Sequence, residues 1–247
     1  MVANLHRMQL PREVVVGNNT LDQIGAICKR LDFSTSALMV MGPKTMEIAG
    51  RKAMDILTHE GLKVDNLVVT SCNIKDIVFV EDKIEELKPQ VVIGIGGGTK
   101  IDVAKISASH KDTPFISVPT TASHDGIASP LVSLKGLDKP YSLMAQAPMA
   151  IVADTSIIIN SSPRFTASGC ADVISKLTSV KDWKLAHEVM DEYYGEYAAN
   201  LALMSARLMV RNASLLKAEK EEGIRVLLEA LISCGVAMSI AVSSRPC

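Results

Sequence analysis

The sequence lacks an excess of charge of either sign. Among its 247 residues, 26 are basic and 27 are acidic, which gives a net charge of −1. The two kinds are spread along the chain, whereas proteins that bind nucleic acid gather cations on one surface to meet the phosphates. The charge balance therefore argues against a nucleic-acid partner.

Paired cysteines are also missing. The five cysteines, at positions 28, 72, 170, 234 and 247, form no CxxC pair and are odd in number. This usage is typical of reduced thiols rather than of a disulfide framework. The first 13 residues do not have the shape of a signal peptide. Both features indicate a cytoplasmic location.

Long hydrophobic runs are nearly absent, although 48% of the residues are hydrophobic. Only the segment 226–242 is apolar at length, and Glu229 interrupts it. A bilayer span needs ~20 apolar residues, so this segment predicts a buried helix and no transmembrane segment.

What the sequence does contain is an alternation of strand and helix patterns up to about residue 162. Strands are predicted at 14–16, 37–41, 64–69, 91–95, 115–118 and 150–153, with helical patterns at 21–31, 46–57, 76–87 and from 99 onward. A hairpin is predicted from 131–134 and 141–144, separated by 135–140. After residue 162 only helical patterns follow, at 168–189, 194–216 and 223–242. This predicts a doubly wound parallel-sheet α/β domain, 1–162, and an all-α domain, 163–247.

The strand at 91–95 runs into three consecutive glycines and then into a helix. Glycines at a helix N-terminus let a pyrophosphate approach backbone N–H groups, which suits a phosphate-binding turn. A plain tight turn is the alternative, but it needs only one glycine. In the helix that follows, we expect Ile101, Ala104, Ile106 and Ala108 inside and Lys100, Lys105 and Ser107 outside.

The segment 119–130, PTTASHDGIASP, follows the strand at 115–118 and should lie at the same sheet edge as the glycines. Its hydroxyls, His124 and Asp125 favour a ligand-binding loop over an ordinary polar loop.

The spacing around Asp172 leaves the role of this residue open. With Ser168 as helix cap, Cys170, Val173, Ile174 and Leu177 would form the buried stripe, and Asp172 could simply pair with Lys176 at i+4. The other histidines, 6, 59, 110 and 187, are expected to be surface or core residues.

Three segments together resemble one known family. They are GGGTKID at 96–102, PTTASHDGIASP at 119–130 and SGCADVISKLTSVKDW at 168–183. In this order the sequence is similar to archaeal sn-glycerol-1-phosphate dehydrogenase, whose superfamily includes glycerol dehydrogenase, iron-dependent alcohol dehydrogenase and dehydroquinate synthase. The likeness extends from the first strand to SSRP at 243–246. SHDGIAS is the sharper signature, because the glycine turn is shared across the superfamily.

The resemblance implies roles for the matched residues. The cofactor pyrophosphate of NAD(H) or NADP(H) would be wrapped by Gly96, Gly97, Gly98, Thr99, Lys100 and Asp102. The nicotinamide and its ribose would be lined by Thr120, Thr121, Ala122, Ser123 and Ser129. Asp125 would act catalytically as a substrate contact, and Asp172 would contact the substrate and bind a catalytic Zn²⁺.

The implied reaction is NAD(P)H-dependent reduction of dihydroxyacetone phosphate to sn-glycerol-1-phosphate, the glycerol backbone of archaeal membrane phospholipids. Two further hypotheses stay open: a glycerol or polyol dehydrogenase, and a non-catalytic dinucleotide-binding remnant. The strand 37–41 ends in Gly42-Pro43-Lys44, without the carboxylate that selects NAD, so we expect both NADH and NADPH to bind. A homo-oligomer is also left open.

The resemblance further predicts a C-terminal truncation relative to the family. A catalytic zinc takes three protein ligands, and the family completes Asp172 with two histidines downstream of SSRP. No histidine follows His187 in this chain. We therefore expect an incomplete helical domain in which the apolar helix 223–242 is left partly uncovered. Val242 also stands where the family usually has glycine.

Overall fold

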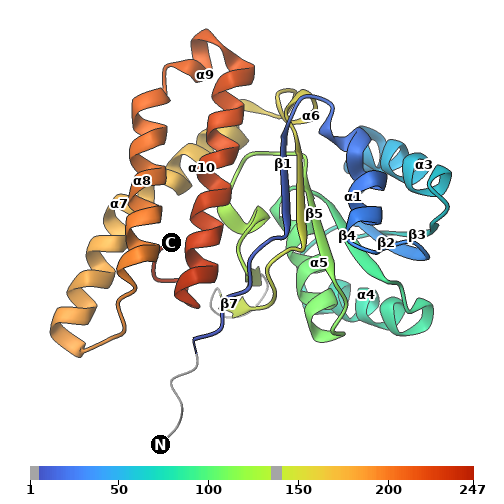
Figure 1. Ribbon diagram of the computed structural model, residues 1–247, viewed down its shortest axis with the longest axis horizontal. Coiled ribbons are helices and arrows are strands. Elements are labelled where there is room, and N and C mark those ends of the chain that lie inside the picture. Colours follow the sequence, from blue (N-terminus) through green and yellow to red (C-terminus); the bar gives the residue numbers. More distant parts are fainter. Residues whose placement is uncertain (1–5, 135–140) are drawn as a thin grey trace, which may run out of the picture.

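The computed structural model describes residues 6–134 and 141–247, which form a sheet region and a helical region side by side (Figure 1). The sheet region is built on six parallel strands in the order β1-β8-β5-β4-β2-β3. Their bounds are Glu13–Gly17 (β1), Ser36–Met41 (β2), Lys63–Val68 (β3), Val91–Gly96 (β4), Phe115–Pro119 (β5) and Ala150–Asp154 (β8). The predicted doubly wound parallel sheet is confirmed.

Helices cover both faces of this sheet. On one face lie η1 (Thr20–Gln23), α1 (Ile24–Arg30), α2 (Pro43–Thr45), η2 (Met46–Gly50) and α3 (Arg51–His59), and on the other α4 (Ile74–Leu87) and α5 (Gly98–His110). The side chains of β2 alternate accordingly, because Met39 joins the core on the α1 side and Leu38 and Val40 join the core on the α5 side. Such burial of both faces explains the continuous apolar runs of the central strands.

The chain reverses direction across the sheet between β2 and β4. From β2 it passes outward to the edge strand β3, and then returns to the other side of β2 to form β4, β5 and β8. In open α/β sheets, ligands bind at the carboxyl ends of the strands where the order reverses. Gly42 after β2 and the glycines after β4 stand at this position.

Two of the three residues expected on an outer face of α5 lie inside. Lys105 and Ser107 are both fully buried in a segment, Ile101 to Ala108, whose residues are all buried, whereas Lys100 is partly exposed. The prediction was wrong because α5 is covered by the sheet, by α4 and by the loop after β5, a tertiary arrangement that a helical repeat does not reveal.

The helical region is formed by α7 (Pro163–Met190), α8 (Glu196–Asn212), α9 (Leu215–Ala218) and α10 (Lys220–Ala241), with the short α6 (Thr155–Ile158) before it. Two details differ from expectation. Ser168 does not cap α7, because Pro163 at the first helical position starts it five residues earlier, after Ser162. Ile174 is exposed, and the buried stripe of α7 consists of Gly169, Val173, Lys176, Val180, Trp183 and Ala186.

Thr20 stands near the start of η1 but does not cap it. It lies inside η1, and Asn19 occupies the cap position in the left-handed region at φ 54°. The backbone N–H groups of Asn19 and Leu21 donate instead to Asp154, at 3.1 and 3.0 Å.

Helix α10 is mostly buried by α8, α7, α9 and the loop after β5. The expected exposed apolar patch on this helix is therefore not found. By length and composition alone α10 could also cross a membrane, but a buried core helix meets the same criterion. Its residues Leu227 and Leu231 belong to the same core cluster as Leu38 and Val40 of the sheet, so one hydrophobic core joins the two regions. The helix ends where Val242 takes a left-handed conformation at φ 50°, which favours glycine.

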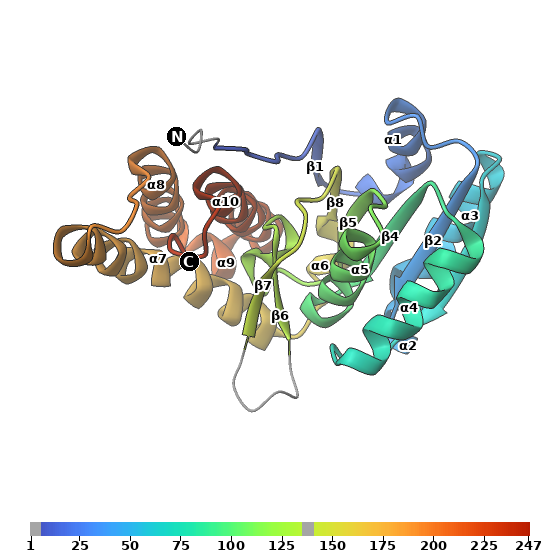
Figure 2. The same cartoon turned by 90° about the horizontal axis from the view of Figure 1, so that it is seen from below.

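The predicted hairpin is confirmed as an antiparallel pair, β6 (Leu131–Leu134) and β7 (Tyr141–Met144). The connecting segment 135–140 lies outside the described residues. Figure 2 shows the hairpin between the helical region and the sheet, where β6 packs against α5.

Candidate active site

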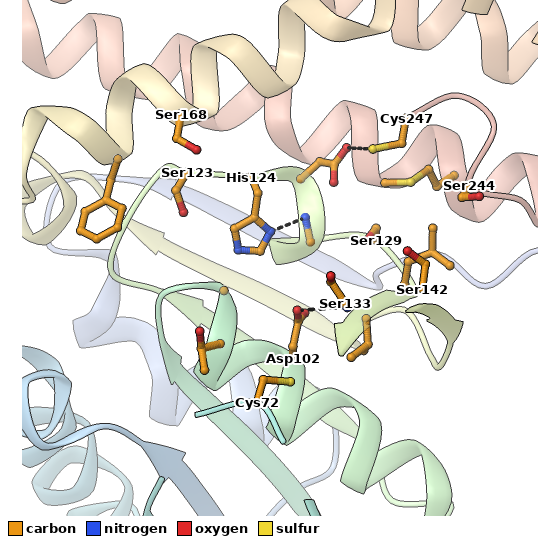
Figure 3. Close-up of a pocket in the computed structure, with 18 residues that line it drawn as sticks. Cys72, Asp102, Ser123, His124, Ser129, Ser133, Ser142, Ser168, Ser244 and Cys247 are labelled. Carbon is orange, nitrogen blue, oxygen red and sulfur yellow. Dashed lines mark hydrogen bonds between the residues drawn. The ribbon is translucent and has the colours of Figure 1, made fainter. Parts of the chain in front are cut away.

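Two cavities meet at the glycine turn on the carboxyl edge of the sheet. The first, of about 1090 Å³, lies between the ends of β2 and β4 and is lined by Gly42, Lys44, Gly97 and Thr120 among others. We call it the β2–β4 cavity. The second, of about 640 Å³, lies between the sheet region and the helical region and contains Gly98, Asp102, His124, Asp125 and Cys247 (Figure 3). We call it the interdomain cavity.

The glycine turn separates the two cavities. Gly97 is the extended residue before α5 and faces the β2–β4 cavity, and Gly98 opens the helix and faces the interdomain cavity. Gly96 has a φ of +155°, and a Cβ there would lie 2.8 Å from the Cβ of Lys100. A Cβ on Gly98 would collide with the ring of His124. Only glycine therefore suits these two positions, while backbone N–H groups at the start of α5 remain open to an anion.

The loop after β5 is held in place by buried polar contacts. The ammonium of Lys105 donates to the backbone carbonyls of Gly126 and Leu131, at 2.7 Å each. Burial lowers the pKa of Lys105, against the opposing effect of the Asp102 carboxylate. His124 caps the short helix η3 (Asp125–Ile127), because its Nδ1 accepts from the N–H of Gly126 at 2.9 Å.

A cluster of two carboxylates, an ammonium and a thiol lies where this loop meets α7. Lys176 Nζ is 2.7 Å from Asp125 Oδ2, 3.2 Å from Asp172 Oδ1 and 3.1 Å from Cys247 Sγ. Asp172 also accepts from the backbone N–H of Asp125 at 2.7 Å. Lys176 thus ties the loop to α7, and it does so with a side chain that is 1% exposed.

The charged groups in this cluster shift each other's pKa values. Burial alone would lower the pKa of Lys176, but Asp125 and Asp172 outweigh it and raise that pKa above its ordinary value. Burial and the neighbouring Asp125 raise the pKa of Asp172, against the opposing effect of Lys176. The lysine therefore stays charged near neutral pH and neutralises part of a carboxylate pair that would otherwise repel.

The structure places the predicted site residues in three groups. Those lining the β2–β4 cavity are Gly97, Lys100, Thr120 and Thr121. Those lining the interdomain cavity are Gly98, Thr99, Asp102, Ser123, Asp125 and Ser129. Gly96 and Ala122 are buried, and Ala122 packs into the core, so it can offer a ligand only its backbone. Asp172 is not among the described lining residues of either cavity, and it accepts a hydrogen bond from the backbone N–H of Asp125.

Sequence reasoning missed the importance of two lysines. Lys176 was considered only as an i+4 partner of Asp172, a contact that the structure does contain, but its shorter contact is with Asp125. Lys105 was expected outside. A sequence signal was available for Lys176. It stands three residues after Val173 and four before Val180, at a position of the apolar stripe of α7, where a lysine indicates a buried charge.

Residues 15–163 match the model of a family described as iron-containing alcohol dehydrogenase. The chain is 47% identical over 242 residues to a glycerol-1-phosphate dehydrogenase [NAD(P)+] of Pyrococcus furiosus, covering 98% of this chain and 70% of the relative. A protein of the same name from Methanothermobacter thermautotrophicus is 45% identical, with 97% and 69% covered. The chain belongs to this family. It is thus a member of the glycerol-1-phosphate dehydrogenases among the iron-containing alcohol dehydrogenases.

Solved structures with low sequence identity share the fold. A glycerol dehydrogenase from Schizosaccharomyces pombe superposes with a TM-score of 0.81 at 22% identity, and the match covers 96% of this chain and 62% of that one. A sulfoacetaldehyde reductase from Bifidobacterium kashiwanohense, solved in complex with NAD+, gives a TM-score of 0.73 at 18% identity, with 94% and 66% covered. The chain therefore spans roughly two thirds of the length of these two neighbours.

Proposed function

We propose that this chain carries out the NAD(P)H-dependent reduction of dihydroxyacetone phosphate to sn-glycerol-1-phosphate, in the cytoplasm and for membrane lipid synthesis. The observation that carries the proposal is the junction of the two cavities at Gly97 and Gly98, next to the Asp125–Lys176–Asp172 cluster. A dinucleotide bound along the first cavity would deliver its nicotinamide to the second. The names of the relatives at 42–47% identity agree with this reaction.

The β2–β4 cavity is proposed as the dinucleotide site. The glycine turn would hold the pyrophosphate, and Thr120 and Thr121 would contact the nicotinamide half. At the end of β2, Lys44 lines the cavity and no carboxylate does so among the described lining residues. Because a carboxylate there would select NAD by holding the ribose 2′-hydroxyl, we propose that both NADH and NADPH are used.

Asp172 is proposed as a ligand of Zn²⁺. The oxygen and sulfur atoms of Asp125, Asp172 and Cys247 lie within 4.8 Å of one another, and they are of the kinds that zinc accepts. The donor set fits a cation, although the ammonium of Lys176 now occupies the position between them. When bound, the ion would polarise the ketone oxygen of the substrate.

The protein's own residues would orient the substrate and control charge. Asp125 faces the cavity and could accept a hydrogen bond from a substrate hydroxyl. Lys176, whose pKa is raised, would keep its proton and act through its charge on the alkoxide that forms as hydride arrives. The proton that completes the alcohol then comes from water, so that ketone, hydride and proton balance the product.

A glycerol or polyol dehydrogenase is the second candidate. It is favoured by one observation: no lysine or arginine is found among the described residues that line the interdomain cavity. A site without cations suits an uncharged polyol at least as well as a phosphate ester.

Substrate preference separates these candidates. NADH oxidation by the protein, reconstituted with Zn²⁺, is measured with dihydroxyacetone phosphate and with dihydroxyacetone. The proposal expects kcat/KM to be at least about a hundredfold higher for the phosphate ester, equal to about 2.7 kcal/mol. Preference for dihydroxyacetone would support the polyol dehydrogenase. If NADH bound but neither ketone reacted, the chain would be a dinucleotide-binding protein only.

A further inference from the structure

His124 has a buried N–H group without a hydrogen-bond acceptor. Its Nδ1 accepts from the N–H of Gly126, so Nδ1 carries no proton and the ring of this neutral histidine must be protonated at Nε2. Nε2 is inaccessible to solvent and has no hydrogen-bond partner among residues 6–134 and 141–247. Leaving such a donor unsatisfied is destabilising, so its retention calls for a functional explanation.

The donor lies at the wall of the interdomain cavity, against the first residue of α5. The ring lines this cavity and lies over Gly98, where a Cβ would collide with Nε2. In Figure 3, His124 and Ser123 lie on the side of the cavity away from Cys247 and Ser244. The reacting end of a substrate belongs with Asp125 and Lys176, so the His124 side is left for the remainder of the molecule.

The chemistry of the lining determines what that remainder can be. Asp102 also faces the cavity, but its Oδ1 lies 3.7 Å from the ammonium of Lys105, which balances its charge. Apart from Asp125, which belongs with the reacting end, the other polar groups are serine and threonine hydroxyls and the thiols of Cys72 and Cys247. His124 supplies the one side-chain N–H among the described lining residues. A phosphate needs several donors directed at its oxygens, and neutral N–H and O–H groups can supply them.

We propose that His124 donates through Nε2–H to the phosphate group of the substrate and is thereby a residue that selects phosphorylated over free ketones and alcohols. This assignment rests on the proposed function, because it takes a triose phosphate as the ligand. The β2–β4 cavity does not include His124 among its described lining residues, which favours the substrate phosphate over the cofactor pyrophosphate.

Two substitutions distinguish the acceptor role of Nδ1 from the donor role of Nε2. In His124→Asn the amide oxygen can still accept from Gly126, but the Nε2 donor is lost. In His124→Gln the longer side chain places an amide N–H near the position of Nε2, while the contact to Gly126 is weakened. Calorimetry measures binding of sn-glycerol-1-phosphate and of glycerol to wild type and both variants, and fluorescence measures binding of NADH.

We expect His124→Asn to weaken binding of sn-glycerol-1-phosphate at least tenfold, or 1.4 kcal/mol. Binding of glycerol and NADH should change less than twofold, and His124→Gln should recover part of the loss. Unchanged affinity of His124→Asn for sn-glycerol-1-phosphate would overturn the assignment, and so would an equal loss for glycerol. A loss confined to NADH would place the donor on the cofactor pyrophosphate instead. Wild type that did not prefer sn-glycerol-1-phosphate to glycerol would contradict the proposed function itself.

Discussion

At the scale of the residue, Lys176 and the glycine turn determine what the site can bind. Lys176 places a fixed cation among Asp125, Asp172 and Cys247, where a metal ion would also have to bind. The glycine turn keeps side chains away from the place where an anion would approach the start of α5. Each feature predicts the effect of one substitution.

Replacing Lys176 with methionine should tighten the binding of a divalent cation. The neutral side chain of similar length leaves the two carboxylates without their cation, so a metal gains the attraction that Lys176 now provides. We expect the affinity for Co²⁺, used as a spectroscopic probe and followed by its visible absorption, to rise at least tenfold. Adding Asp172→Asn should reverse the gain. Equal Co²⁺ affinities of wild type and Lys176→Met would contradict the competition.

Replacing Gly97 with valine should block the dinucleotide without unfolding the protein. The backbone of Gly97 is extended, and a Cβ there would meet only Thr121 Oγ1, at 3.3 Å. The valine would instead fill the β2–β4 cavity where the pyrophosphate is proposed to lie. We expect at least a tenfold loss of NADH affinity in a fluorescence titration, with little change in thermal stability.

Gly94→Val is the matched control for this substitution. A Cβ on Gly94 would lie 2.9 Å from Ala104 and 3.0 Å from Phe115, inside the core. Overpacking there should lower the free energy of unfolding by about 1–3 kcal/mol. The phosphate-binding assignment of the turn would be wrong if Gly97→Val bound NADH as tightly as wild type.

At the scale of the element, α7 and α10 pack directly against the loop after β5, which carries the candidate site. A Cβ on Gly235 of α10 would lie 2.6 Å from the backbone nitrogen of Ser129 and 2.8 Å from the carbonyl carbon of Ala128. On α7, a Cβ on Gly169 would collide with the backbone carbonyl of Ala122. Glycines on two helices thus allow the close approach that positions this loop.

Gly235→Val should therefore affect both stability and ligand binding. The added side chain must push α10 away from the loop, which costs about 1–3 kcal/mol in the free energy of unfolding and displaces Ser129. We expect weaker binding of NADH as well as a lower midpoint in urea. Ser233→Ala, on a half-buried position of the same helix, should leave both quantities nearly unchanged. A Gly235→Val variant with normal NADH binding would show that helix contact does not position the loop.

At the scale of the whole molecule, one core cluster extends from the strands of the sheet into α10. A second cluster lies under α1 and α3, and a third surrounds Trp183 between α7, α8 and α10. Because the shared cluster connects the sheet region with the helical region, neither can lose its packing alone.

Unfolding in urea should accordingly be a single cooperative transition. The single tryptophan, Trp183, reports on the helical region through its fluorescence. Cys28, a fully buried residue of α1, reports on the sheet region through its modification by a thiol reagent, located by mass spectrometry. We expect the two probes to give the same midpoint. Clearly separated midpoints would mean that the regions unfold independently and that the shared cluster contributes little coupling.

The sequence by itself determined the parallel α/β sheet, the hairpin, the later helices and the glycine turn. These features arise from short-range patterns: β-branched runs, helical spacing and glycines at one strand end. The start of α7 was misplaced although its signal, Ser162 before Pro163, was also local.

Only the tertiary structure decided which charges are buried and what they meet. Lys105 reaches carbonyl groups 21 and 26 residues away, and Asp125 and Asp172 meet across 47 residues. No periodicity relates such positions, because their distance depends on how strands order in the sheet and how α7 and α10 pack on the loop after β5. What Nε2 of His124 faces is decided in the same way, because the order of the strands brings Gly98 at the start of α5 against the loop after β5.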